Sequence, residues 1–275
     1  GIWRYKRTVS VKLLIVEGNN EQTRLQRGAF GIKPYHLMFQ EMLRGLVPKA
    51  QSDFAFPADG ASNLPTSAQL EKYDGVLWTG SSLSVLDDIP DVQQQLNFAN
   101  EVFKTGVPFY GSCWGMQVAT VVAGGMVALS KNGLEFGISK PIDLTLLGRE
   151  SPLTSHRKKA YSALCIHYDE VAKAPENAII LASNAHSKVQ AMTFDYKKGS
   201  FFGVQYHPEF NPSDMALIAS FLSEKLVKSN AFDSMEEVQE FALSLREQKG
   251  IPPEICDYQL HTQEISAWLR HISGE

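Results

Sequence analysis

The chain has 275 residues, of which 44% are hydrophobic and 20% are charged, a balance typical of a globular protein with a buried core and not of a disordered one. It carries 26 Lys and Arg against 30 Asp and Glu, so its net charge of −4 provides none of the basic surface that nucleic-acid binding requires. No apolar run approaches the ~18 residues of a membrane span, and three cysteines are too few for a disulfide framework and fit a reducing, cytoplasmic compartment.

In the first half of the chain, short apolar segments alternate with segments of helical periodicity. The predicted strands are 11–16, 53–56, 75–80 and 107–111, and the predicted helices are 34–46, 91–105 and 116–123. The strands are short and mostly apolar, whereas the helices carry apolar residues three and four positions apart. Strands that alternate with helices in this way indicate parallel βαβ units.

The second half is richer in strands and ends in helices. The predicted strands are 127–129, 141–146, 178–182, 189–194 and 201–206, and the predicted helices are 214–227, 235–248 and 259–272. The succession of strands indicates a mixed sheet or an antiparallel extension. We expect the final helices to dock on the domain, because their apolar stripe is too short for the ~3–4 heptads of a coiled coil. Residues 1–10 are expected to form a tail, charged but without the apolar segment of a signal peptide.

The segment Gly111-Ser112-Cys113-Trp114-Gly115 lies between a predicted strand and a predicted helix. A nucleophile between two glycines in this context is typical of the sharp turn that exposes a catalytic side chain at the carboxyl edge of a sheet. The helix N-terminus would favour the thiolate of Cys113, which is its reactive form. The alternative interpretation is a buried cysteine in a glycine-rich turn.

The predicted strand 201–206 leads directly into His207-Pro208-Glu209. Residues two apart in an extended chain point the same way, so His207 and Glu209 can both reach one site. There His207 would be the general base for Cys113 and the acid for the leaving amine, while Glu209 would hold the imidazole in the useful tautomer. By itself this segment would also suit a surface histidine at the end of a strand.

In combination, Gly111 to Gln117 and His207-Pro208-Glu209 resemble the class I glutamine amidotransferases, the triad-type glutaminase domains of GMP synthase, anthranilate synthase and carbamoyl phosphate synthetase. The resemblance covers roughly residues 12 to 225. It implies a Cys-His-Glu triad and an α/β, flavodoxin-like three-layer sandwich with a mostly parallel, mixed central sheet. The expected units are an N-terminal tail at 1–10, the glutamine amidotransferase domain at 11–230 and a helical C-terminal extension at 231–275.

The resemblance also implies an oxyanion hole. Thr79-Gly80-Ser81 stands where the family has a glycine-rich loop after a strand, so backbone N–H groups at Gly80 and Ser81 would form one half of the hole. The N–H of Trp114 would form the other half. Ser81 departs from the family pattern, which has glycine there, and a residue with a Cβ resists a positive φ. An ordinary Gly/Ser turn is the alternative.

Three further residues are implied in substrate binding. Gln117, one helical turn after the nucleophile, matches a position that contacts the substrate amide; a core glutamine that caps backbone groups is the alternative. His167 and Asp169 match a His-x-Asp-x-Val segment of the GMP synthase branch, near the bound glutamine, with Ile166 in place of the usual serine. A structural His167–Asp169 pair is equally compatible with the sequence. The other His and Cys residues lack metal-ligand spacing, so we expect no metal site.

The resemblance implies that the chain cleaves the γ-carboxamide of glutamine through a γ-glutamyl thioester and releases ammonia, without a cofactor. About 66 residues follow Glu209, too few for the synthetase domain that uses the ammonia, so one expected partner is a synthetase on a separate chain. A stand-alone γ-glutamyl hydrolase or peptidase, acting on γ-glutamyl amides or peptides, is the alternative. A further alternative is an inactive binding or regulatory module on the same fold. We expect neither a nucleic-acid nor a membrane partner.

Overall fold

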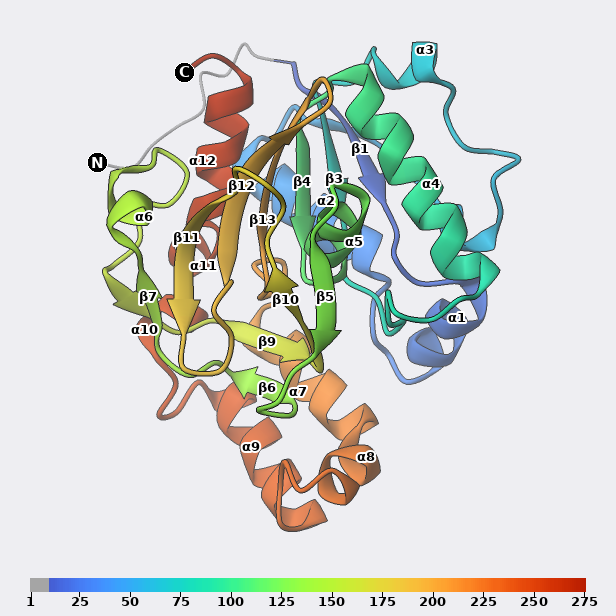
Figure 1. Ribbon diagram of the computed structural model, residues 1–275. Helices are drawn as coiled ribbons and strands as arrows, with labels where there is room; N and C mark the ends of the chain where they lie inside the picture. Colours follow the sequence, from blue (N-terminus) through green and yellow to red (C-terminus); the bar gives the residue numbers. More distant parts are fainter. Residues whose placement is uncertain (1–9) are drawn as a thin grey trace.

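The computed structural model describes residues 10–275, and residues 1–9 of the predicted tail lie outside the described part. A nine-stranded sheet in the order β2-β1-β3-β4-β13-β12-β11-β7-β8 forms the centre of the described chain (Figure 1). Its strands are β1 (Lys12–Val16), β2 (Gln51–Ala55), β3 (Gly75–Trp78), β4 (Phe109–Ser112), β7 (Ile142–Leu144), β8 (Ala160–Tyr161), β11 (Ile179–Asn184), β12 (Ala191–Tyr196) and β13 (Gly199–Val204). Neighbours from β2 to β13 are parallel, and those from β13 to β8 are antiparallel. The predicted flavodoxin-like α/β fold with a mixed sheet is confirmed, although its antiparallel part is as extensive as its parallel part.

The parallel part of the sheet is buried on both faces. In β1, Leu13 and Ile15 point into one layer of the core, while Leu14 and Val16 point into the other. All four side chains are fully buried, and each burial contributes roughly 1.5–3 kcal/mol to stability. This two-sided burial explains why the strand is a continuous apolar run in the sequence.

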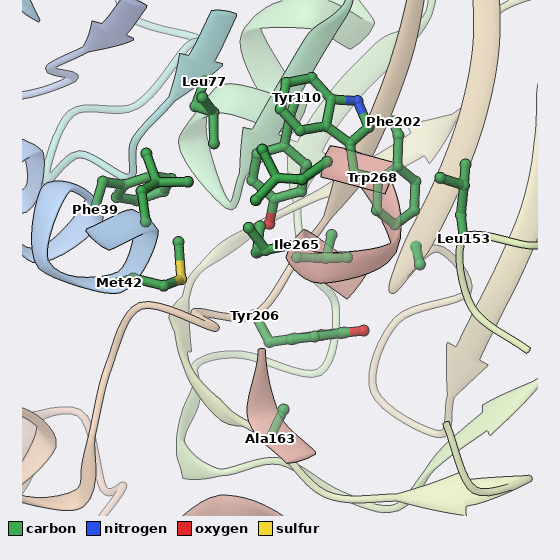
Figure 2. Packing of buried hydrophobic residues seen from close by; sticks show 14 of the residues in the cluster. Phe39, Met42, Leu77, Tyr110, Leu153, Ala163, Phe202, Tyr206, Ile265 and Trp268 are labelled. Carbon is green, nitrogen blue, oxygen red and sulfur yellow. The ribbon is translucent and has the colours of Figure 1, made fainter. Parts of the chain in front are cut away.

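Helices cover both faces of the sheet, and one of them comes from the end of the chain. One face carries α4 (Pro90–Thr105) and α5 (Trp114–Val122), and the other carries α2 (Tyr35–Leu46) and α12 (Gln263–Ile272). Figure 2 shows Ile265 and Trp268 of α12 beside Tyr110 and Phe202 of the sheet, and the ring centroids of Tyr110 and Trp268 lie 5.8 Å apart. The last helix of the chain therefore completes the third layer.

Two small antiparallel sheets lie beside the central sheet. One pairs β5 (Met126–Leu129) with β10 (Asp169–Lys173), and the other pairs β6 (Glu135–Ile138) with β9 (Leu164–His167). Of these four strands, the sequence predicts only the first. The others place Glu135, His167 and Asp169 at buried positions, so polar residues interrupt the apolar alternation that marks a strand.

The helix α1 (Glu21–Ala29) has no counterpart among the predicted elements. It begins after Asn20, whose side chain accepts a hydrogen bond from the N–H of Thr23 at 2.9 Å. Its one large apolar side chain, Leu25, is 66% exposed, whereas Arg27 is buried. No apolar stripe marks this helix, because it turns polar side chains toward the rest of the protein.

The predicted helix 214–227 consists of two helices, α7 (Pro212–Phe221) and α8 (Ser223–Lys228). A third helix, α9 (Met235–Glu247), packs against α7, and together they form the lobe at the lower end of Figure 1, beyond the carboxyl ends of β1 and β4. The shorter helices are the 3-10 turn η1 (Pro57–Asp59), α3 (Ser67–Leu70), α6 (Leu146–Glu150), α10 (Pro253–Cys256) and α11 (Tyr258–His261). Within residues 10–275, no helix has the length and apolar character needed to cross a membrane.

Candidate active site

Cys113 occupies the turn between β4 and α5. Its φ of 51° and ψ of −103° lie outside the regions that residues with a Cβ favour, a conformation that costs on the order of 1–3 kcal/mol. The Cys113 N–H donates to the carbonyl of Val204 at 2.8 Å, which holds the turn against β13. A Cβ at Gly111 would lie 2.4 Å from the carbonyl carbon of Gly115, so the two glycines permit the close approach that the turn requires.

His207 and Glu209 follow β13 and meet as the two-residue spacing predicts. Nδ1 of His207 lies 2.6 Å from Oε1 of Glu209, and both side chains are buried. The ring of Phe210 stacks on the imidazole, with centroids 4.2 Å apart and planes 5° from parallel. The glutamate and the phenylalanine together fix the orientation of the imidazole, as a general base requires.

The Nε2 atom of His207 is buried and makes no hydrogen bond of ordinary geometry within the described chain. Burial opposes protonation of the imidazole, but the Glu209 carboxylate and the nearby Cys113 sulfur outweigh it and hold the pKa of His207 well above its ordinary value. An imidazolium beside Cys113 is the partner that a thiolate needs.

Two other groups contact the Cys113 sulfur. The side-chain amide of Gln205 donates to Sγ at 3.4 Å, and the carbonyl oxygen of Ile166 lies 3.5 Å from Sγ. Gln205 is fully buried and was not anticipated from the sequence. The argument that pairs His207 with Glu209 could have found it, because Gln205 stands two residues before His207.

The loop after β3 lies against His207. A Cβ at Gly80 would be 2.7 Å from Cε1 of His207, so only glycine brings the backbone this close. The hydroxyl of Thr79 donates to the carbonyl of Gly80 at 2.8 Å and fixes the peptide that carries the N–H of Ser81. Ser81 is not among the described residues with a positive φ, so the serine fits where the family has glycine. Its hydroxyl donates to Asn19 at 3.0 Å.

Gln117, His167 and Asp169 lie together on another wall of the site. The amide of Gln117 and Nδ1 of His167 both donate to the backbone carbonyl of Asp169, at 3.0 and 2.8 Å. The carboxylate of Asp169 accepts a hydrogen bond from the hydroxyl of Ser84 at 2.6 Å. His167 therefore bonds the main chain of Asp169 and not its carboxylate.

Glu135, His167 and His186 form a buried cluster whose potential metal-ligating atoms lie within 4.8 Å of one another. Nε2 of His167 lies 2.9 Å from Oε1 of Glu135, and Nε2 of His186 donates to the carbonyl of Gly133 at 2.9 Å. Burial alone would raise the pKa of Glu135, but hydrogen bonds from His167 and neighbouring amides lower it below its ordinary value. A metal ion would have to displace these hydrogen bonds. The cluster is therefore explained as a hydrogen-bonded group that supports the cavity wall at His167.

Two hydrogen bonds connect the C-terminal helices to the residues on either side of His207. The Nδ1–H of His261 donates to the carbonyl of Pro208 at 2.9 Å. The hydroxyl of Tyr206 donates to the carboxylate of Glu264, on α12, at 2.6 Å. Both contacts are buried, so this end of the chain helps to position the imidazole.

A cavity of about 570 Å³ contains Cys113 and His207, within the range of ~300–1,000 Å³ that small-molecule sites occupy. Its lining is completed by Thr23, Gln26, Arg27, Tyr35, Ser81, Ser82, Leu83, Ser84, Leu86, Asp87, Gln117, Leu129, Leu134, Ile166, His167, Tyr168, Asp169, Phe221, Leu222, Lys225 and Leu226. The cavity thus joins the turn at Cys113, the loop after β3 and helices α1, α7 and α8.

The family model of glutamine amidotransferase class-I matches residues 56–227, which include the turn at Cys113, the wall around His167 and the His207 segment. The chain belongs to the class-I glutamine amidotransferase family. A γ-glutamyl-L-1-hydroxyisopropylamide hydrolase from Pseudomonas sp is 30% identical to this class-I glutamine amidotransferase over 95% of this chain and 93% of the relative.

GMP synthases match a smaller part of this class-I glutamine amidotransferase. A glutamine-hydrolyzing GMP synthase subunit from Saccharolobus solfataricus is 30% identical over 54% of this chain and 74% of the relative. The GMP synthase of Lactobacillus johnsonii is 30% identical over 56% of this chain, and the match covers only 29% of that protein. A solved glutamine amidotransferase from Thermotoga maritima shares the fold, with a TM-score of 0.68 and 17% identity over 96% of this chain and 99% of its own.

Proposed function

We propose that this protein hydrolyses γ-glutamyl amides through a thioester on Cys113. The arrangement that carries the proposal is the strained Cys113 at a helix N-terminus, in the same cavity as a His207 imidazole that is held by Glu209 and has Nε2 unbonded. This is the set of groups that nucleophilic acyl transfer requires: a nucleophile, a proton carrier and a group that orients the carrier.

In the first half-reaction, Sγ of Cys113 attacks the γ-carbonyl carbon of the substrate. The negative charge that develops on oxygen is stabilised by backbone N–H groups at Gly80–Ser81 and at Trp114, the first residue of α5. His207 delivers its proton from Nε2 to the amide nitrogen, the C–N bond breaks, and the amine leaves. The glutamyl group remains on Cys113 as a thioester.

In the second half-reaction, neutral His207 removes a proton from water, and the resulting hydroxide attacks the thioester carbon. The C–S bond breaks, glutamate leaves, and the thiolate–imidazolium pair is restored. Glu209 keeps Nδ1 protonated throughout, because its carboxylate accepts the hydrogen bond from that atom. The glutamyl portion would lie against Gln117, His167 and Asp169, which line the cavity beside the sulfur.

Two observations favour an organic amine as the leaving group. The cavity extends from His207 over Phe221, Leu222 and Leu226, which is more space than departing ammonia uses. In addition, the Pseudomonas γ-glutamyl amide hydrolase matches this chain over nearly the whole length of both proteins. A peptide or alkylamide of γ-glutamate would fill this space.

Glutamine is the second candidate substrate, with a separate synthetase chain as the acceptor of ammonia. The match to the Saccharolobus GMP synthase, which by name is one subunit of a larger enzyme, favours this candidate. In that case the apolar part of the cavity would be covered by the synthetase.

An assay of the isolated protein with both kinds of substrate distinguishes the γ-glutamyl amide hydrolase from the glutaminase. We expect amine release from γ-glutamyl alkylamides or peptides to exceed ammonia release from glutamine in kcat/KM, and Cys113→Ala to abolish both. A protein that hydrolyses only glutamine would favour the second candidate. If Cys113→Ala keeps full activity, the nucleophile is assigned wrongly.

A further inference from the structure

Arg27 is a buried cation in the candidate active site. It lies on α1 with its side chain only 7% exposed, and it lines the same cavity as Cys113 and His207. Thr23 and Gln26, on the same face of the helix, line the cavity too. Neither the family resemblance nor the proposed chemistry gives this arginine a role.

Among residues 10–275, no carboxylate pairs with Arg27. Within this part of the chain, its side chain makes one hydrogen bond, from Nη1 to the hydroxyl of Tyr35 at 3.0 Å. Its guanidinium lies 5.5 Å from the Tyr35 ring centroid and 5.7 Å from that of Phe221. The two acidic residues that line the cavity, Asp87 and Asp169, form no ion pair with it. A guanidinium has five donors, so the bond to Tyr35 leaves donors available to a ligand in the cavity that Arg27 lines.

An unpaired buried charge is costly, and proteins normally neutralise it with a partner. Contacts with two aromatic rings offset part of the cost, on the order of 0.5–2 kcal/mol each. An anionic ligand that binds the guanidinium would offset the remaining free-energy cost of its burial. A carboxylate matches the planar fork of a guanidinium in geometry and charge.

The position of Arg27 identifies which end of the substrate it meets. The leaving nitrogen must approach Nε2 of His207 to receive a proton. Tyr35 packs beside that imidazole, with ring centroids 6.0 Å apart, and holds Arg27 through its hydroxyl. The groups suited to the glutamyl portion, Gln117 and Asp169, gather at another wall, where they bond to each other.

We propose that Arg27 binds the carboxylate of the departing amine, so that the preferred substrates are γ-glutamyl derivatives of apolar amino acids. This assignment rests on the proposed hydrolysis of γ-glutamyl amides and narrows its substrate class. Phe221 lies beside the guanidinium, and Leu222 and Leu226 line the same cavity, so together they provide a surface for an apolar side chain. Lys225, exposed on α8, adds a second cation to this end of the cavity.

The test compares γ-glutamyl-leucine with γ-glutamyl-leucine amide, two substrates of nearly equal size that differ in one negative charge. For the wild-type protein we expect kcat/KM to be about 10- to 100-fold higher for the acid, as a hydrogen-bonded charge pair provides. Arg27→Met should bring this ratio toward one, and Arg27→Lys should leave it intermediate. Arg44→Met is the matched control, because Arg44 is exposed on α2 and does not line the cavity; it should keep the wild-type ratio.

Two outcomes would overturn the assignment. Equal kcat/KM values for the two substrates in the wild-type protein would show that no leaving-group carboxylate is recognised, and this result needs no variant to fold. A fall of both values by the same factor in Arg27→Met would assign Arg27 to the glutamyl portion or to a structural role.

A failure of the proposed function is separable from a failure of this subsite. If the wild-type protein hydrolyses neither compound, the hydrolytic proposal fails, and binding to Cys113→Ser protein then tests the subsite by calorimetry. Tighter binding of γ-glutamyl-leucine than of its amide, with the difference lost when Arg27→Met is added, would support the subsite. Equal dissociation constants would refute it.

Discussion

His207 and His167 both line the cavity around Cys113, and each is hydrogen-bonded to a buried glutamate. The two regions differ in the second ring nitrogen. In His167, Nδ1 is hydrogen-bonded to the Asp169 carbonyl and Nε2 to the Glu135 carboxylate, so both nitrogens are occupied. In His207, Nδ1 faces Glu209 and Nε2 has no hydrogen bond within the described chain.

In the proposed mechanism, the same two residue types therefore build a support in one region and a proton carrier in the other. A histidine whose two nitrogens are both bonded to fixed partners holds its neighbours in place and has no nitrogen left to meet a substrate. One with a single fixed nitrogen is oriented and still able to exchange a proton at the other. Residue identity alone does not distinguish a supporting histidine from a proton carrier, whereas the hydrogen-bond partners of the two ring nitrogens do.

The largest effect is expected from Cys113, the proposed nucleophile, which lies in the cavity that both regions line. Cys113→Ala should reduce amine or ammonia release to background, measured by a coupled glutamate assay. Cys256→Ala is the control and should retain activity. Burial raises the pKa of Cys165 well above its ordinary value, so iodoacetamide at neutral pH should alkylate Cys113 and spare Cys165. Preferential labelling of Cys165 would contradict this prediction.

Glu209→Gln should remove the carboxylate that orients His207, the proposed proton carrier. We expect kcat/KM to fall by about 10²–10⁴, as when the orienting carboxylate of a triad is replaced. Because the Glu209 carboxylate raises the pKa of His207, the alkaline limb of the pH–rate profile should move to lower pH in the variant. Glu41→Gln, on the surface, is the control. An unshifted limb would show that Glu209 does not set this pKa.

Gly80→Ala tests how closely the loop after β3 approaches His207. The added Cβ would meet Cε1 of His207 at 2.7 Å and displace either the ring or the peptide. A displacement of this size should lower kcat/KM by about 10²-fold. Gly28→Ala, on α1 with open space around its Cβ, is the control. Unchanged kinetics in Gly80→Ala would place the reacting atoms away from this loop.

The smallest effect on chemistry is expected in the supporting region. Glu135→Gln should change kcat less than tenfold but reduce the free energy of unfolding by about 3 kcal/mol, because it removes one member of a buried pair. Since the pKa of Glu135 is lowered in the folded state, its contribution is present above its ordinary value of 4.5 and disappears as the pH falls through the folded pKa. Denaturation curves of variant and wild type should therefore converge in acid. A loss of kcat as large as in Glu209→Gln would erase the distinction between the two regions.

The parts of the site that the sequence predicts are those defined by local spacing. The turn at Cys113 follows from two glycines between a strand and a helix, and the contact of His207 with Glu209 follows from two-residue periodicity. The role of Glu135 could not be predicted, because it lies 32 residues before His167 in the sequence and no local pattern indicates that the two residues pair. Arg27 was missed for a related reason, since its helix turns polar groups inward.

The fold shows the same division. Strands buried on both faces, such as β1, are visible as apolar runs, and the sheet they form was predicted. The strands β6, β9 and β10 were not predicted, because each has a buried polar residue, Glu135, His167 or Asp169, that interrupts the apolar pattern. The signal that defines secondary structure is weakest where the chain carries function.

The hydrogen bonds from His261 to Pro208 and from Tyr206 to Glu264 have a practical consequence for protein engineering. A chimera that borrowed only the first 230 residues would inherit the thiol and the imidazole, yet leave the backbone around the imidazole without its two distal anchors. A carboxyl-terminal deletion series would therefore serve as an assay of how firmly the imidazole is held.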